Sequence, residues 1–400
     1  MQTLGETFVQ RGAQVGGVWI ALLVITAVAA PFIATTFPYY VRYADGTSAS
    51  PLLQHLSPMD VTLSVAFLAG LVLYFVKRWS AGRRTMIVIG LAVATFIGAS
   101  AVSRLAGGKL FHPMEGSYYS IYREQAAADK ITYALWAPIP YSPGDRLRDI
   151  RGVTHPLAPS AEHPLGTGGN GSSVLSNMIH ASRIALTVGF ISTGIAIAIG
   201  IVIGGVMGYF AGWVDLFGMR LVEIVSAIPT IFLLLAFVAF FPGDPQFSPF
   251  GLITITIPRL YMIMAILGVT GWIGYARFIR AEFLKLRQQD FVIAARACGL
   301  PLRSILFRHM LPNGVTPVLV MASFGVAGAI LTEATLSFLG LGLDEEPSWG
   351  TLLSQASAST GGFHWWLAIY PGAAIFLTVF AYNLIGEAMR DVIDPHTRQK

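Results

Sequence analysis

Residues 184–214 read IALTVGFISTGIAIAIGIVIGGVMGYFAGWV and carry no charged side chain. A helix needs about 20 apolar residues to cross the hydrocarbon core of a bilayer. Inside lipid the backbone must satisfy its own hydrogen bonds, so a stretch of this kind becomes a helix. The stretch therefore predicts a membrane-spanning helix, and its glycines between residues 200 and 208 predict close packing against a neighbouring helix.

Comparable uncharged runs recur along the chain and predict an all-α polytopic membrane protein of about eight transmembrane helices. The runs lie within residues 12–41, 61–76, 85–103, 184–214, 224–242, 260–276, 315–336 and 365–385. Pro229 and Pro371 are expected to bend the fifth and the eighth helix. The first run is interpreted as an uncleaved anchor and not a signal peptide, because it is longer than an ordinary signal sequence.

The composition agrees with lipid as the main solvent. Hydrophobic residues make up 54% of the chain and charged residues only 12%, against about 25% charged residues in soluble domains. The net charge of +5 lies in short clusters between apolar runs, which is typical of membrane topology and not of a nucleic-acid interface. The single cysteine, Cys298, excludes an internal disulfide and a cysteine-rich metal site. We therefore predict no nucleic-acid partner and no metal.

Catalytic patterns are missing from the sequence. No glycine-rich run ends in Gly-Lys-Ser/Thr, so the chain is not expected to hydrolyse ATP through a Walker-type loop. His163 and His180 lack metal-ligand spacing, and no Ser/His/Asp arrangement supports nucleophilic catalysis. The prediction is a protein that is not an enzyme, with no catalytic residue and no cofactor of its own.

Basic residues set the orientation of the predicted helices. Two loops carry most of them: residues 77–84, between the second and third runs, and residues 277–308, between the sixth and seventh. Both loops fall on the same side of the membrane if the chain alternates, and the positive-inside rule makes that side cytoplasmic. Both termini are then also cytoplasmic. Residues 104–183 lie outside, where the aromatic side chains are expected at the membrane interface or, alternatively, on a receptor-contact surface (Tyr118, Tyr119, Tyr122, Tyr133 and Trp136).

The loop between the sixth and seventh runs is long and organised. We predict a short helix from Phe291 to Cys298, capped by Asp290 and stopped by Gly299. Helical spacing gives this helix a small-residue face made of Phe291, Ala294, Ala295 and Cys298. Two interpretations remain at this point: the helix docks into a groove of a partner protein, or it lies on the lipid headgroups.

These residues resemble the cytoplasmic coupling loop of ABC importer permeases, whose consensus is E-A-A, three residues, G, nine residues, then I-x-L-P. The matching positions are Ala294, Ala295, Gly299, Leu311 and Pro312. Ile293 and His309 depart from that consensus. With Asp290, Phe291, Val292, Arg308 and Asn313, these departures are similar to the peptide/nickel branch of the family.

The resemblance covers roughly residues 160–396. It includes HPLGT at 163–167, GYFAGWVD at 208–215, SFLGLG at 337–342 and PSWG at 347–350. The chain is most similar to the second permease of dipeptide and oligopeptide importers, and residues 135–139 (LWAPI) are similar to the microcin C and peptide branch. Gly168, Ser172 and Ser173 stand where the family has Asp, Arg and Asp, so no polar role is carried over to them.

The resemblance implies a permease subunit that translocates peptides with energy from separate ATPases. The implied partners are a second homologous permease, cytoplasmic ABC ATPases that bind ATP, an extracytoplasmic substrate-binding protein, a peptide substrate and membrane lipid. The implied location is the bacterial inner membrane, and the coupling residues are Asp290, Phe291, Ala294, Ala295, Gly299, Leu311 and Pro312. The same complex carrying nickel or another small solute is the alternative, and a secondary transporter is less favoured because it requires paired buried ionisable groups.

The domain organisation follows from these assignments. Residues 1–103 are expected to form an N-terminal anchor and an extra helix pair, added to a six-helix permease core. Residues 104–180 form an extracytoplasmic segment, and residues 181–400 form the core with a coupling loop at 281–313. Within the core, Glu333 is the candidate pathway residue, because an intramembrane carboxylate is costly and is by default a functional hypothesis. A hydrogen bond to a neighbouring helix or loop is the other interpretation of Glu333.

Overall fold

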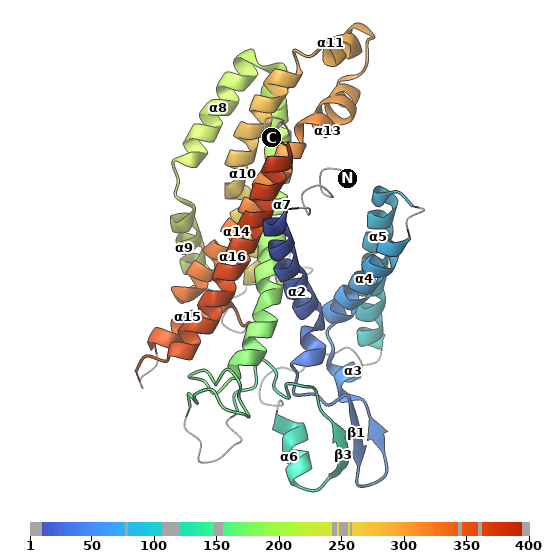
Figure 1. Ribbon diagram of the computed structural model, residues 1–400, viewed down its shortest axis with the longest axis vertical. Coiled ribbons are helices and arrows are strands. Elements are labelled where there is room, and N and C mark those ends of the chain that lie inside the picture. The colour runs from blue at the N-terminus through green and yellow to red at the C-terminus, as the bar shows by residue number, and fades with distance from the viewer. Residues whose placement is uncertain are drawn as a thin grey trace. The chain divides into compact units, whose positions relative to one another are not determined.

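The computed structural model describes residues 10–76, 79–105, 120–147, 155–241, 246–247, 255–256, 258–342, 346–358 and 362–393 (Figure 1). Among these residues, seven helices are long and apolar enough to cross a membrane, and eight if the bent pair α8–α9 counts as one span. The predicted all-α multi-pass fold is confirmed. The helices that correspond to the eight predicted runs are α2 (Arg11–Ile33), α4 (Pro58–Phe75), α5 (Ala81–Leu105), α7 (Val174–Phe210), α8 (Gly212–Ser226) with α9 (Thr230–Phe240), α10 (Arg259–Leu286), α14 (Thr316–Phe338) and α16 (Trp365–Ile393).

Two of these spans begin ten or more residues before their predicted limits. Helix α7 begins at Val174, ten residues before the predicted run, because polar residues of its first turns are buried within protein and not exposed to lipid. The fifth span begins at Gly212 and is broken by 62° between α8 and α9. The break confirms the predicted bend at Pro229, which has no N–H and cannot continue the hydrogen bonding of α8.

The described residues divide into two compact units. The first comprises Met1–Ala21, Ala185–Leu343 and Ala373–Lys400, and the second comprises Leu22–Ile184 and Asp344–Gly372. This division follows contacts within the chain. The functional division at residues 103 and 180 stays a prediction.

The second unit contains a small antiparallel sheet that the helix pattern did not predict. Strand β1 (Tyr40–Tyr43) pairs with both β2 (Ser48–Ala49) and β3 (Ile131–Leu135), in the order β2-β1-β3. Helices α3 (Pro51–His55) and α6 (Ile121–Ala127) lie in the same unit. The aromatic side chain of Tyr122 on α6 is 7% exposed and packs with Phe37 and Val41, so the expected interface position is wrong for this tyrosine. Tyr133 is 56% exposed, and Tyr118 and Tyr119 lie outside the described residues.

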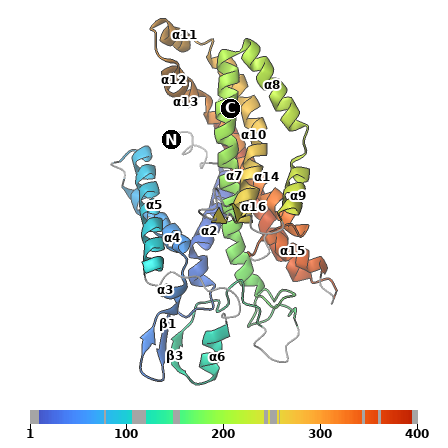
Figure 2. The same ribbon diagram turned by 180° about the vertical axis from the view of Figure 1, so that it is seen from behind.

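Helices α4 and α5 form a hairpin that lies side by side in both views (Figures 1 and 2). Its apolar side chains are largely exposed, as expected for a hairpin surrounded by lipid. At its base, Ser57 and Asp60 form a reciprocal capping box at the start of α4. Asp60 also pairs with Arg183 of α7 at 2.5 Å, which ties α4 to α7.

The first unit is built on the close approach of α7 and α10. A Cβ added at Gly200 would lie 2.5 Å from the Cβ of Tyr275, and one at Gly208 would lie 2.6 Å from the Cβ of Phe283. Gly204, between them, faces the backbone of Ala276. The predicted close packing of this glycine run is confirmed, since three glycines at four-residue spacing place one bare helix face against α10.

Five further helical elements and two short strands complete the helices and strands of the described residues. The loop between α10 and α14 contains α11 (Asp290–Ala297), α12 (Leu302–Ser304), a π-helical segment (Ile305–Met310) and α13 (Leu311–Gly314). Helix α15 (Trp349–Ala358) belongs to the second unit, and strands β4 (Gln246–Phe247) and β5 (Ile255–Thr256) pair in the first.

Candidate functional site: the coupling loop

Helix α11 lies at the end of the first unit where α7 passes into α8 and α10 ends (Figures 1 and 2). It runs from Asp290 to Ala297, with Gln289 at the N-cap position. Asp290 was expected to be the cap, and this expectation is wrong by one residue. The Gln289 side chain makes no capping hydrogen bond. Asp290 lies in the first turn, where its negative charge interacts favourably with the positive end of the helix dipole and stabilises the helix.

The C-terminal end of α11 agrees with the sequence. Gly299 has φ of +71°, a conformation that favours glycine. The amide of Gly299 donates to the carbonyl of Arg296 at 2.9 Å, and the amide of Leu300 donates to the carbonyl of Ala295 at 3.1 Å. These two bonds form a Schellman motif, so the predicted stop at Gly299 is confirmed.

The two faces of α11 have different surroundings. Val292 is fully buried and Ala295 is 7% exposed, and both pack in a cluster with Ile279 and Phe283 of α10. Phe291 is 40% exposed, and Ala294 and Cys298 are also exposed. The predicted small-residue face is therefore divided: Ala295 faces α10 of its own chain, because it lies three residues after Val292. We call the remaining exposed residues, Phe291, Ala294 and Cys298, the docking face.

Two arginines fasten this loop to the end of α7. The guanidinium of Arg296 lies over the ring of Tyr209, 4.6 Å from its centroid. Arg287 donates to the carbonyl of Tyr209 at 3.2 Å. Sequence reasoning noted Tyr209 only as part of a resemblance, and no local signal links it to residues about 80 positions later.

A charged pair also joins α8 to α10 beside the loop. Arg280 on α10 donates to Asp215 on α8 through two guanidinium nitrogens, one of them at 2.6 Å from the carboxylate. Bidentate pairs of this kind fix geometry as well as charge. Helix α8 is thereby held on the helix that leads into the coupling loop.

The second half of the coupling motif lies on and after the π-helical segment. Leu311 packs against the same buried cluster as Val292, while Pro312 is exposed. A proline has no N–H and its ring clashes with the carbonyl four residues earlier, here that of Arg308. The wider π-helical turn just before Pro312 relieves this conflict, and Pro312 is the sequence signal that points to it. π-helical segments are rare in proteins, and those that occur are often found at functional sites.

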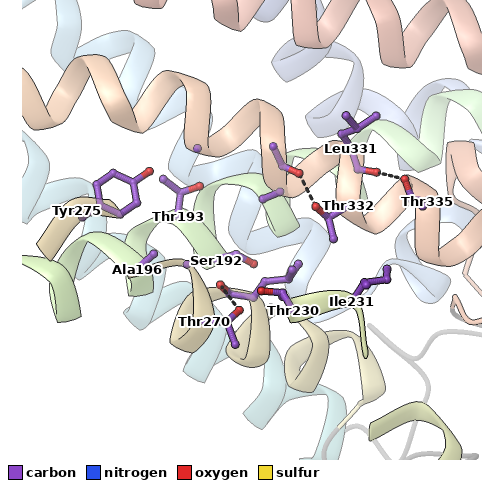
Figure 3. Close-up of a pocket in the computed structure, with 15 residues that line it drawn as sticks. Ser192, Thr193, Ala196, Thr230, Ile231, Thr270, Tyr275, Leu331, Thr332 and Thr335 are labelled. Atoms are coloured by element: carbon purple, nitrogen blue, oxygen red, sulfur yellow. Dashed lines mark hydrogen bonds between the residues drawn. The ribbon is translucent and has the colours of Figure 1, made fainter. Parts of the chain in front are cut away.

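Glu333 lies on α14 and is 5% exposed. Its carboxylate accepts a hydrogen bond of 2.7 Å from Ser337, one turn later on the same helix. A cavity of about 470 Å³ opens beside α14 (Figure 3), and Glu333 is not among the described residues that line it. A role for Glu333 in the pathway stays a prediction, and the structure shows a hydrogen-bonded position within the helix.

Comparison with known proteins identifies this arrangement. The family described as the binding-protein-dependent transport system inner membrane component matches residues 200–399. The oligopeptide transport system permease protein OppC of Haemophilus influenzae is 37% identical over 244 residues, which cover 60% of this chain and 73% of that protein. The dipeptide transport system permease protein DppC of Alkalihalophilus pseudofirmus is 33% identical over 238 residues, which cover 59% and 73% of the two chains.

Among solved structures, one described as inward-facing conformations of the MetNI methionine ABC transporter aligns with 55% of this chain and 98% of its own, at 18% identity and a TM-score of 0.39. The sequence matches span α10, the coupling loop and α14, the elements that carry the site described above. The chain belongs to the family of binding-protein-dependent transport system inner membrane components, and it is the membrane-spanning permease subunit of an ABC importer.

Proposed function

We propose that this permease carries peptides into the cytoplasm, together with a second permease, two cytoplasmic ATPase subunits and an extracytoplasmic substrate-binding protein. The relatives named for oligopeptide and dipeptide transport support peptides as the cargo. ATP is bound by the ATPase subunits and not by this chain. The observation that carries the proposal is the docking face of α11, which is exposed while the adjoining residues Val292 and Ala295 of the same short helix are buried.

The docking face has the chemistry of a helix that enters a groove. Ala294 and Cys298 are small, so a partner surface can approach the helix closely, and Phe291 supplies one large apolar anchor beside them. The Schellman end at Gly299 and the contacts of Arg296 hold the helix in a fixed orientation without any partner. Binding of the ATPase therefore requires little ordering of this loop.

The proposed orientation places the coupling loop, the N-terminus and the C-terminus in the cytoplasm of a bacterial inner membrane. The basic residues between α10 and α14 support it through the positive-inside rule (Arg287, Arg296, Arg303 and Arg308). Counting α8 with α9 as one crossing gives an even number of spans, so both termini lie on one side. The sheet β2-β1-β3 then belongs to the extracytoplasmic side.

The test is reconstitution of the complete complex in proteoliposomes with Ala294→Trp in the docking face. The expected result is ATPase association and ATP-driven peptide uptake lowered by about tenfold or more, because a large side chain blocks close approach. Ala127→Trp is the matched control, since Ala127 is also an exposed helical alanine but lies on α6 in the other unit. Normal association and uptake by the Ala294→Trp complex would contradict the docking role.

The cargo is tested in the same vesicles. A labelled peptide and radioactive nickel are offered separately to the wild-type complex, with and without ATP. ATP-dependent accumulation of the peptide supports the proposed cargo. Accumulation of nickel alone contradicts it while leaving the coupling role intact, and uptake without ATP contradicts an ABC mechanism.

A further inference from the structure

The cavity of the first unit is formed by α7, α9, α10 and α14, and Figure 3 shows side chains from all four helices around one space. Its volume of about 470 Å³ falls in the usual range for small-molecule sites. Hydroxyl groups supply its polarity: Ser192, Thr193, Thr230, Thr270, Tyr275, Thr332 and Thr335 line it. None of the lining residues that the structure describes carries a charge.

Most of these hydroxyls face the cavity as hydrogen-bond acceptors. Thr270, Thr332 and Thr335 each donate their proton to a carbonyl one turn earlier on their own helix, at 2.8 Å in each case. Tyr275 donates to the carbonyl of Met321 at 3.3 Å. A hydroxyl oxygen that has used its proton still has lone pairs. The walls on α10 and α14 can therefore receive N–H groups from a molecule in the cavity.

Ser192 on α7 supplies the complementary donor. Its residue is 2% exposed, and its hydroxyl has no hydrogen-bond partner among the described residues. An unpaired buried hydroxyl is unfavourable, so its presence in a cavity wall points to a partner that is bound only part of the time. A carbonyl oxygen of a molecule in the cavity would supply the missing acceptor.

A peptide backbone carries both required groups, N–H donors and C=O acceptors, in every residue whatever its side chain. A fixed charge in the wall would bind peptides of opposite charge and repel those of like charge, whereas passage requires binding that is weak and shared among several groups. Resting on the proposed function, we infer that this cavity is the subunit's part of the peptide path, and that Ser192, Thr270, Thr332 and Thr335 hold the backbone of the peptide without selecting its side-chain charge.

The experiment introduces opposite charges at one wall position. Complete complexes carrying Thr332→Asp or Thr332→Lys are reconstituted and supplied with Ala-Glu-Ala, Ala-Lys-Ala and Ala-Ala-Ala. For each complex we take the ratio of Ala-Glu-Ala uptake to Ala-Lys-Ala uptake and divide it by the same ratio for the wild-type complex. This division removes the preference of the binding protein, which is the same in every complex. We expect the ratio to fall in the Asp variant and rise in the Lys variant, differing between them by about tenfold or more. Thr332→Asn, which adds size without charge, leaves the ratio unchanged.

Ser192→Ala provides a second, independent readout. This change removes the unpaired hydroxyl, so the thermal stability of the complex stays equal or rises. Uptake of all three peptides is expected to fall by the same factor, roughly three- to tenfold, because one hydrogen bond to the backbone is lost. A purely structural serine would not lower uptake while preserving stability.

The outcomes separate the inference from the proposed function. The inference is overturned if the wild-type complex takes up peptides and both charge variants keep the wild-type ratio of acidic to basic peptide uptake. Unchanged uptake in the Ser192→Ala complex also overturns it, even if neither charge variant assembles. No ATP-driven uptake of any peptide by the wild-type complex instead overturns the proposed function.

Discussion

Replacing Gly204 by alanine places a methyl group between two helix backbones. The added Cβ lies 2.9 Å from the Cα and 3.0 Å from the carbonyl carbon of Ala276, and closer still to its carbonyl oxygen. Ordinary contact begins at 3.4 Å, so relief of the closest contact, the one to the carbonyl oxygen, requires α7 and α10 to separate by roughly 1 Å. Because backbone faces backbone, no side chain can rotate away. Overpacking of this kind costs about 1–3 kcal/mol, and we expect a value in the upper half of that range.

Alanine also favours the helix by about 1 kcal/mol relative to glycine. The net expectation for Gly204→Ala is therefore a loss of about 1–2 kcal/mol in the free energy of unfolding. Gly194→Ala is the matched control on the same helix, since a Cβ there meets nothing within 4 Å. The control is expected to gain about 0.5–1 kcal/mol.

The two variants are compared by thermal unfolding of the purified protein in a single detergent, and by ATP-driven uptake in vesicles. Unfolding midpoints that move in opposite directions support the close approach of α7 and α10. Midpoints that rise equally in both variants would refute it, because helix propensity alone would then account for the result.

Three further predictions concern other parts of the chain. Asp60→Asn weakens the cap at Ser57 and the pair with Arg183, and is expected to cost at least about 1 kcal/mol, measured by thermal unfolding against Ser64→Ala. Burial raises the pKa of Tyr122 to about 12 from 10.0, so stability falls as the pH rises through this interval, and Tyr122→Phe removes that fall in unfolding midpoints. Gly299→Val adds about 1–2 kcal/mol of backbone strain and is expected to lower ATPase co-purification, which an unchanged yield would contradict.

Sequence reasoning succeeds where one local cause decides the structure. Uncharged runs predict the spans because lipid leaves the backbone no other partner. The Schellman end of α11 is predictable because only the φ of Gly299 is needed. The bend at Pro229 follows in the same way from a missing amide proton.

The remaining features depend on contacts between distant residues. Spacing groups Ala295 with Phe291 and Ala294, but the burial of Val292 turns Ala295 inward, and only the position of α10 determines this. The pairing of β1 with β3 joins Arg42 to Tyr133, and neither strand has a pattern that identifies the other. The cavity escapes prediction because its hydroxyl residues are spread over four helices at spacings that also suit lipid-facing or packed positions.

The coupling loop and the cavity share the same two helices, and this gives a physical route between them. Helix α11 is held to α10 through Val292 and to α7 through Arg296 and Tyr209. The glycine face of α7 packs directly against Tyr275, Ala276 and Phe283 of α10, so a force on one helix is carried directly to the other. We therefore expect a displacement of α11 to move the walls that carry Ser192 and Thr270 together. A change that loosens the α7–α10 contact, such as Gly204→Ala, is expected to separate movement of the loop from movement of the cavity. The Gly204→Ala complex should therefore retain its association with the ATPase and show reduced peptide uptake.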